Sequence, residues 1–248
     1  MTRLFAALVL AVLALPARAD ELAAGLSTDS IRITSSFRGA DIVLFGAVAA
    51  ASHLGDLQGR DIVVTLRGPD AAITVQRKAR VAGLWINTEE AAVTGLPGFY
   101  YLASTRPLAQ IADDATLARL HLGAPHLAAT IAVAADANAF RAAAIRVKTR
   151  ARLYGESSTG VELLGQHLFR VRIRLPAGVP PGRYRAEVYL FDKGAMTAHV
   201  ATTLPIGKTG LERRLADYAQ NQPLPYGLAA VVMALALGWL GFAVFRQR

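Results

Sequence analysis

The sequence predicts a mainly β protein with helices. We expect an immunoglobulin-like antiparallel β-sandwich, in one domain or two, with an α-helical segment and one C-terminal transmembrane helix. Three observations lead to this fold class. Short stretches rich in Ile, Val, Thr and aromatic residues recur between turn residues. An alanine-rich stretch with helical spacing lies between them, and a charge-free apolar run lies near the C-terminus.

Residues 1–19 have the features of a signal peptide. Arg3 gives a positive start, residues 4–15 are apolar, and the small residues Ala17 and Ala19 stand where signal peptidase requires them. An uncleaved anchor helix is the alternative, but about a dozen apolar residues are short for crossing a bilayer. We therefore expect cleavage after Ala19 and export of the chain that follows.

Residues 20–105 are predicted to form a β-sandwich-like region. The turn cluster Arg67–Asp70 separates two of the predicted strands, and the region lacks the long helices of a parallel sheet. The predicted strands are 30–37, 41–48, 61–66, 72–81, 83–86 and 99–104.

Residues 106–154 are predicted to form a helical segment of two or three helices. In the clearest helix, from Asp136 to Tyr154, Asp136 is the expected N-cap. Phe140, Ala144 and Val147 fall on its apolar face, and Lys148 falls on another.

Residues 155–207 are predicted to be β-rich and to complete the sandwich or add a second one. The segment Leu168–Leu175 has the cleanest alternation in the chain. One set of residues points inward and the other points outward; the inward set is Phe169, Val171, Ile173 and Leu175, and the outward arginines are Arg170, Arg172 and Arg174. Two further strands, 183–191 and 197–206, are expected to form a hairpin around Asp192–Gly194.

The C-terminal part is predicted to be an amphipathic helix at 208–222, a transmembrane helix at 223–245 and a cytoplasmic tail at 246–248. The charge-free run Tyr226–Phe245 has 20 residues, which make a helix of about 30 Å, the thickness of the hydrocarbon core. Arg246 and Arg248 follow it and favour the cytoplasmic side. The expected location is the bacterial inner membrane, single-pass, with the body periplasmic.

Small residues recur along one side of this helix. They are Gly227, Ala230, Ala234, Gly238 and Gly241. Such a ridge lets a second membrane helix approach closely, so we expect these residues to form a packing face. The expected partners are the lipid bilayer and a membrane protein.

Charge and composition exclude several other classes of function. The chain has 27 Lys and Arg against 18 Asp and Glu. Four of these cations lie in the leader and the tail, and the rest are spread along the chain, so we expect no nucleic-acid binding. The chain has no cysteine, which excludes thiolate metal sites and thiol nucleophiles.

No stretch has the spacing of a known catalytic or metal-binding motif. His121 and His126 are five residues apart with Pro125 between them, so they cannot share a helix face as a zinc pair would, and we expect surface or loop histidines. Asp113 and Asp114 are expected to start a helix. We therefore expect no catalytic residue, no cofactor and no metal ligand, and a protein that is not an enzyme.

Several segments resemble a family of transmembrane proteins of unknown function found mainly in alphaproteobacteria. They are 31–47, 61–69, 81–87, 99–108, 168–191 and the stretch from Lys208 through the membrane helix. The resemblance implies a signal sequence, an exported body and one C-terminal membrane helix. Relatives encoded near sulfite-exporter-like permeases suggest a transporter as the partner.

The expected function is that of a noncatalytic, membrane-tethered β-sandwich that binds or organises a partner such as a membrane transporter. An exported hydrolase with an unrecognised site is one alternative. A periplasmic ligand- or glycan-binding sensor is another, and would need an exposed aromatic platform built from residues such as Tyr100, Tyr101 or Trp85. We expect Trp85 to lie in the core instead, between the apolar residues Leu84 and Ile86.

Overall fold

Two packed β-sheets form the body of the protein. The computed structural model describes residues 21–49, 57, 59–132, 136–208, 219–220 and 222–245. The first sheet has the order β1–β3–β11–β10. Its strands are β1 (Glu21–Leu26), β3 (Gly39–Ala49), β11 (Leu168–Pro176) and β10 (Val161–Leu164).

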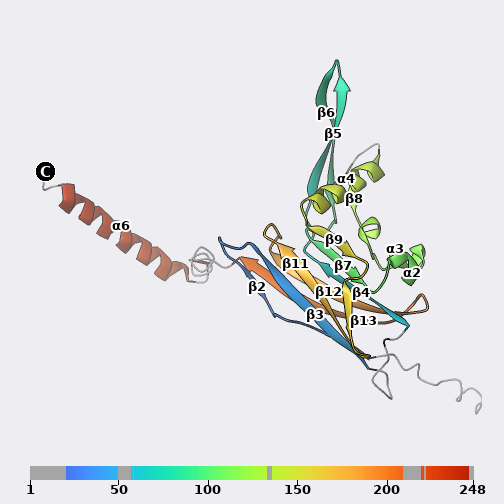
Figure 1. Cartoon of the computed structure of the whole chain (residues 1–248). Helices are drawn as coiled ribbons and strands as arrows, with labels where there is room; N and C mark the ends of the chain where they lie inside the picture. The colour runs from blue at the N-terminus through green and yellow to red at the C-terminus, as the bar shows by residue number, and fades with distance from the viewer. Residues whose placement is uncertain are drawn as a thin grey trace, which may run out of the picture.

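The second sheet has the order β2–β13–β12–β4–β7–β9. Its strands are β2 (Ile31–Ile33), β13 (Ala195–Lys208), β12 (Gly182–Asp192), β4 (Arg60–Arg67), β7 (Tyr100–Ser104) and β9 (Tyr154–Ser157). Strands β5 (Ile73–Val81), β6 (Leu84–Thr94) and β8 (Thr130–Ile131) form a third, small sheet. Figure 1 shows the β5–β6 hairpin projecting from the body.

The inner faces of the two large sheets share one hydrophobic core. In β11 the four predicted inward residues, Phe169, Val171, Ile173 and Leu175, are fully buried, as the strict alternation predicts. Across from them lie residues of the second sheet, among them Val64 of β4. The register places Phe169 opposite Gly46, where an added Cβ would lie 2.6 Å from the Ala23 carbonyl oxygen. Because Gly46 has no side chain, the backbone of β1 can lie close to β3 at this point.

The N-terminal and C-terminal β-regions build this core together. Strand β3 pairs with β11, and β4 pairs with β12. Strands from residues 155–207 therefore lie in the same sheets as strands from residues 21–105. The pairing is antiparallel except at two edges of the second sheet, where β2–β13 and β7–β9 are parallel, so the expectation of a wholly antiparallel sandwich is wrong there. Its immunoglobulin-like character stays a prediction.

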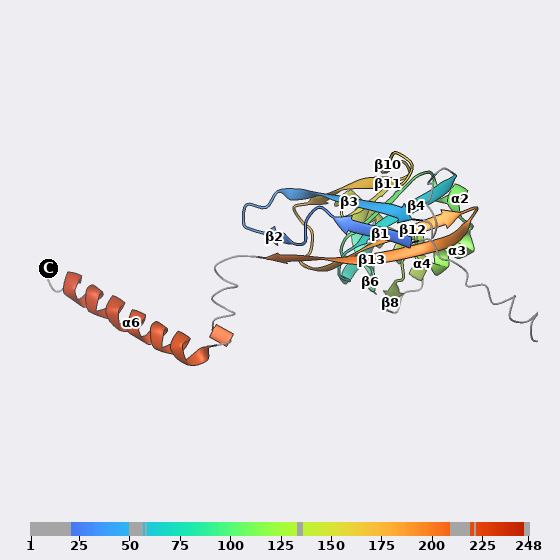
Figure 2. The same cartoon turned by 90° about the horizontal axis from the view of Figure 1, so that it is seen from below.

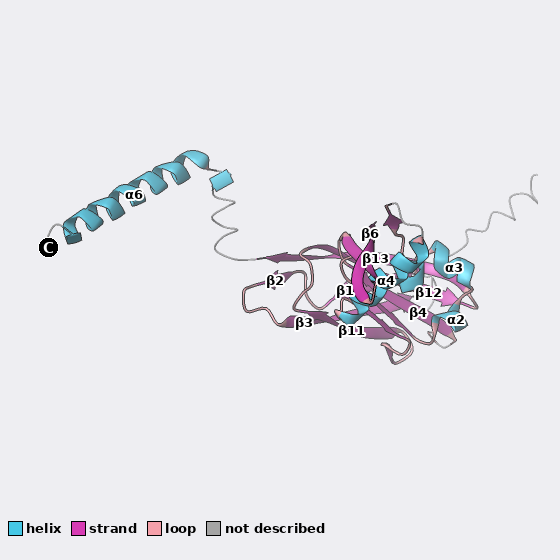
Figure 3. Cartoon of the chain, turned by 90° about the horizontal axis from the view of Figure 1, so that it is seen from above, coloured by secondary structure: helices cyan, strands magenta, loops and turns pink. Residues whose placement is uncertain are grey.

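Short helices cover the outer face of the second sheet. They are α2 (Leu108–Ile111), α3 (Asp114–Arg119), the 3₁₀ helix η1 (Ala124–His126) and α4 (Ala137–Arg150). Together with Val63, Tyr189 and Phe191 of the sheet, their apolar residues form a second core. Figures 2 and 3 show α2 and α3 at the end of the body away from the C-terminal helix.

Both predicted helix starts are confirmed. The Asp113 carboxylate accepts a hydrogen bond from the Thr116 amide at 3.0 Å, and Asp136 accepts one from the Ala139 amide at 3.0 Å. These contacts satisfy backbone donors that have no partner within the first turn of a helix.

The predicted burial of two segments is wrong. Trp85 was expected in the core but is 68% exposed near the end of the β5–β6 hairpin, with Leu84 and Ile86 exposed beside it. In α4, Val147 is 48% exposed, whereas Lys148 is 5% exposed and joins Phe140 and Ala144 on the buried face. Positions 140, 144 and 148 follow the four-residue spacing of one helix face.

The C-terminal helix α6 (Pro223–Phe245) has 23 residues and lies apart from the sheets in all three views. Its side chains at 240, 241 and 243–245 lie outside the described part. In the portion of the chain that is described, no helix combines the length and apolarity needed to cross a membrane. The predicted signal peptide (1–19), the tail (246–248) and most of the predicted amphipathic helix (208–222) also lie outside it.

The ammonium group of Lys148 is held between α4 and the sheet. Its Nζ donates to the Pro97 carbonyl oxygen at 3.1 Å and lies 5.7 Å from the centre of the Tyr154 ring. The Tyr154 hydroxyl donates to the same carbonyl at 2.8 Å. Burial lowers the pKa of Lys148, while the Asp70 carboxylate acts in the opposite direction. The fold therefore disfavours the charged form of this lysine.

Replacing Lys148 by Met should change how stability depends on pH. The folded-state pKa of Lys148 lies below its ordinary value of 10.5, so the unfolded chain binds more protons between these two values. The cost of burying the lysine is largest below the folded-state pKa and disappears as the pH rises through 10.5. The gain in unfolding free energy of Lys148→Met over the wild type should thus be smaller at about pH 10 than at about pH 7, as measured by urea unfolding.

The matched control is Lys78→Met, because Lys78 is an exposed lysine on β5. This variant should show the same difference from the wild type at both pH values. A gain for Lys148→Met that does not change with pH would show that the fold does not lower the pKa of Lys148.

Candidate functional site

An open cleft with three arginines lies where one end of each sheet meets α4. It has a volume of about 640 Å³ and lies beside the start of β3, the end of β11 and β9. Arg38, Arg152 and Arg174 line it, and we call it the arginine cleft. Its only carboxylate lining residue in the described structure is Asp41, which accepts a hydrogen bond from Arg174 Nε at 3.2 Å. The three arginines allow the cleft to attract an anion. The ion pair between Arg174 and Asp41 is exposed to water, and this exposure weakens the ion pair.

A second cleft, of about 470 Å³, lies on the outer face of the second sheet, and we call it the sheet cleft. Its lining includes Asp70, His121 and Glu187. Each of these groups contacts a neighbour: Asp70 accepts a hydrogen bond from Arg67 at 2.7 Å, and the His121 ring donates from Nδ1 to the His126 carbonyl oxygen at 2.9 Å. Glu187 accepts a hydrogen bond from the Tyr189 hydroxyl at 3.0 Å, and His199 Nε2 lies 3.7 Å from its carboxylate.

Burial changes the acidity of two tyrosines in the sheet cleft. It raises the pKa of Tyr100, whose hydroxyl oxygen accepts a hydrogen bond from the Gly123 amide at 3.0 Å. It also raises the pKa of Tyr189, an effect that the nearby Glu187 strengthens. Both hydroxyls therefore stay protonated and act as packing and hydrogen-bonding groups.

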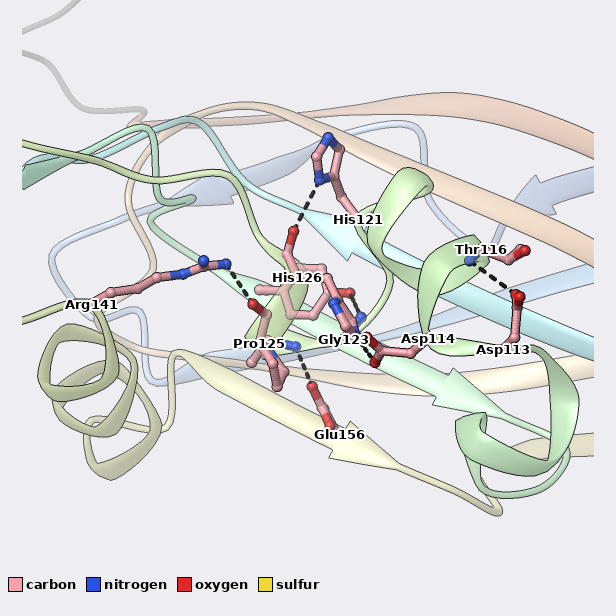
Figure 4. Close-up of polar contacts among 11 residues, drawn as sticks. Asp113, Asp114, Thr116, His121, Gly123, Pro125, His126, Arg141 and Glu156 are labelled. Atoms are coloured by element: carbon pink, nitrogen blue, oxygen red, sulfur yellow. Dashed lines mark hydrogen bonds and ion pairs between the residues drawn. The ribbon is translucent and has the colours of Figure 1, made fainter. Parts of the chain in front are cut away.

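The two histidines singled out in the sequence hold the η1 turn in place (Figure 4). His126 Nε2 lies 3.4 Å from the Asp114 carboxylate, at the start of α3. The Ala124 amide donates to Glu156 of β9 at 2.6 Å, and Arg141 of α4 donates to the carbonyl oxygens of Pro125 and Leu127. These contacts connect one turn to three elements, which is a structural role. In the part of the chain with described coordinates, no three metal-ligating side chains come together.

The predicted packing residues of the C-terminal helix all lie in α6. They are Gly227, Ala230, Ala234, Gly238 and Gly241. A Cβ added at Gly227 or Gly238 would meet no atom within 4 Å, and Ala230 and Ala234 are exposed. The surroundings of Gly241 lie outside the described part. The helix is also apolar on its other sides, since Leu228 and Trp239 are each 68% exposed.

The end of the β5–β6 hairpin is an apolar surface that the sequence analysis missed. Val81, Leu84, Trp85 and Ile86 are 49%, 71%, 68% and 45% exposed. The sequence signal for this hairpin is the dipeptide Ala82–Gly83. Both residues have positive φ, and together they make the tight turn that such hairpins need. Of the residues named for an aromatic platform, Tyr100 is buried in the second core, Tyr101 is half-buried and lines the arginine cleft, and Trp85 lies on this hairpin.

Comparison with known proteins identifies the family. A family model described as "Putative transmembrane protein (Alph_Pro_TM)" matches residues 21–247. No curated protein and no solved structure matches the chain. The matched range takes in the sheets, the helical layer and α6 and confirms the resemblance found in the sequence. The chain therefore belongs to this transmembrane protein family.

Proposed function

We propose that this protein is a single-pass inner-membrane protein whose periplasmic body is noncatalytic and binds a membrane partner, such as a transporter. Helix α6 is the tether and part of the binding surface. The observation that carries this proposal is the exposed apolar surface of α6, where Leu228, Leu235 and Trp239 are between 65% and 70% exposed with no described neighbour element covering them. Such a surface requires lipid or a partner helix around it.

The sequence supports a membrane crossing by the whole apolar run. Tyr226–Phe245 carries no charged residue. The proposed membrane span includes residues 240, 241 and 243–245, whose side chains lie outside the described part. Arg246 and Arg248 would remain on the cytoplasmic side. A signal peptide at residues 1–19 would send the body to the opposite side of the membrane.

The small-residue face supports a helical partner. Spacings of three and four residues from Gly227 to Gly241 place the small residues on one side of α6. Open space at Gly227 and Gly238 would allow a second helix to come close. The noncatalytic role is supported by the sheet cleft, where the contacts of Asp70, His121 and Glu187 are with residues of the fold.

The topology can be tested in cells that make the full chain. Protease added to intact spheroplasts should digest the body, and carbonate washing should leave the chain in the membrane. The double substitution Val232→Arg/Leu235→Arg should release it, because each arginine at a helix centre costs about 3 kcal/mol of insertion free energy. The control Leu163→Arg alters an exposed residue of β10 and should stay in the membrane. A body that resists protease in spheroplasts would overturn the topology.

The packing face can be tested by crosslinking in native membranes. A photoreactive amino acid at position 234 should give a discrete adduct with one membrane protein, whereas the same group at position 236 should not, because Ala236 lies on the opposite side of α6. Ala234→Leu should reduce adduct formation from position 238 several-fold by filling the ridge, and Ala236→Leu should not. Equal adducts from both faces, or free monomer alone, would contradict a specific helical partner.

A further inference from the structure

The end of the β5–β6 hairpin is a small apolar projection. Cross-strand pairing places Val81 opposite Leu84 and Ala79 opposite Ile86, which puts these four residues on one face of the ribbon. Arg80 lies opposite Trp85 on the other face. Figure 1 shows this end of the hairpin beyond all helices of the body. A folded, water-soluble surface seldom gathers its large apolar residues at such a point.

The charge of the projection has one sign. Between residues 78 and 88 the sequence contains Lys78 and Arg80 and no carboxylate. The nearest acidic residues along β6 are Glu89 and Glu90, toward the body, where Arg77 lies 3.2 Å from Glu89 and Gln76 donates to Glu90. The end of the hairpin is therefore cationic next to an apolar face, and the negative charges lie behind it.

We propose that this hairpin end is a peripheral contact with an anionic phospholipid bilayer. Val81, Leu84, Trp85 and Ile86 enter the interfacial layer, and Lys78 and Arg80 meet the lipid phosphates. Tryptophan is enriched in the interfacial layer because its ring is amphipathic. Cations near an anionic lipid surface strengthen the binding of a protein to that surface. The proposal rests on the membrane anchorage proposed above, which holds the body next to a bilayer.

The size and shape of the projection favour lipid over a protein. A specific protein–protein interface buries about 800 Å² on each partner, more than four side chains at the end of a two-stranded ribbon can provide. A lipid surface needs no complementary shape. Residues 209–222 connect β13 to α6, so the body that carries the hairpin is joined directly to the proposed anchor.

The full chain has two tryptophans, so fluorescence can report each surface alone. Trp239→Phe leaves only Trp85, and Trp85→Phe leaves only Trp239. Both variants are reconstituted into vesicles of phosphatidylglycerol and phosphatidylcholine, with or without bromine on the acyl chains. We expect bromine to quench the fluorescence of Trp85 and of Trp239 alike. We also expect Trp85 in the vesicle-bound Trp239→Phe variant to emit at shorter wavelength than Trp85 in the same variant unfolded without detergent.

Substitutions then separate the two parts of the proposal. In the Trp239→Phe background, Leu84→Ser/Ile86→Ser should abolish the quenching of Trp85, while Leu163→Ser/Leu164→Ser, which alters exposed residues of β10, should preserve it. Lys78→Glu/Arg80→Glu should lower it, and the charge-matched control Arg172→Glu/Arg183→Glu should not. Quenching in pure phosphatidylcholine should be weaker than in anionic vesicles.

The outcomes distinguish this proposal from the anchorage. If bromine quenches Trp239 but not Trp85, the hairpin contact is overturned and the anchorage stands. If neither is quenched, both are wrong. If Trp85 is shielded from aqueous acrylamide but insensitive to bromine, a protein or a second copy covers the hairpin and the lipid assignment is overturned. Equal quenching in neutral and anionic vesicles would overturn the role of Lys78 and Arg80.

Discussion

The burial of β4, and of residues 188–191 of β12, on both faces is the constraint on which the body depends. Ile62, Val64 and Leu66 of β4 face the first sheet, whereas Val63 belongs to the second core under the helices. A strand that is apolar on both faces must be covered on both faces. The helical layer between the two β-regions of the sequence is therefore required by the sheet that it covers, and the body cannot be divided at the boundaries of those regions.

The one carboxylate at the start of β4 shows how strictly this rule is kept. Asp61 is 5% exposed, and its oxygens accept hydrogen bonds from Arg106 Nε at 2.7 Å and Nη2 at 2.6 Å and from the Thr105 hydroxyl at 3.0 Å. A buried carboxylate without such partners would be costly. Because both partners follow β7, this contact fixes the point at which the chain leaves the sheet for the helices.

Sequence reasoning succeeded where periodicity alone decides the outcome. The alternation around Phe169 and the caps Asp113 and Asp136 need only local information, and the structure confirms them. It failed where distant chain segments decide. Lys148 is buried because the Pro97 carbonyl lies within reach of its amine, and Trp85 is exposed because its hairpin extends beyond any covering element. The small residues of α6 were predicted from spacing, but the arginine cleft joins Arg38, Arg152 and Arg174 from three separate segments.

The parallel pairing of β2 with β13 has a mechanical consequence. Ile206, Gly207 and Lys208 pair with Ile31, Arg32 and Ile33, and Lys208 is the last residue of β13 before the segment that leads to α6. Tension between an anchored α6 and a body held by a partner would pull along β13. Since ladder hydrogen bonds run across the strands, such a load shears the bonds to β2 and β12 together and cannot unzip them one at a time. The attachment point would thus be loaded in shear.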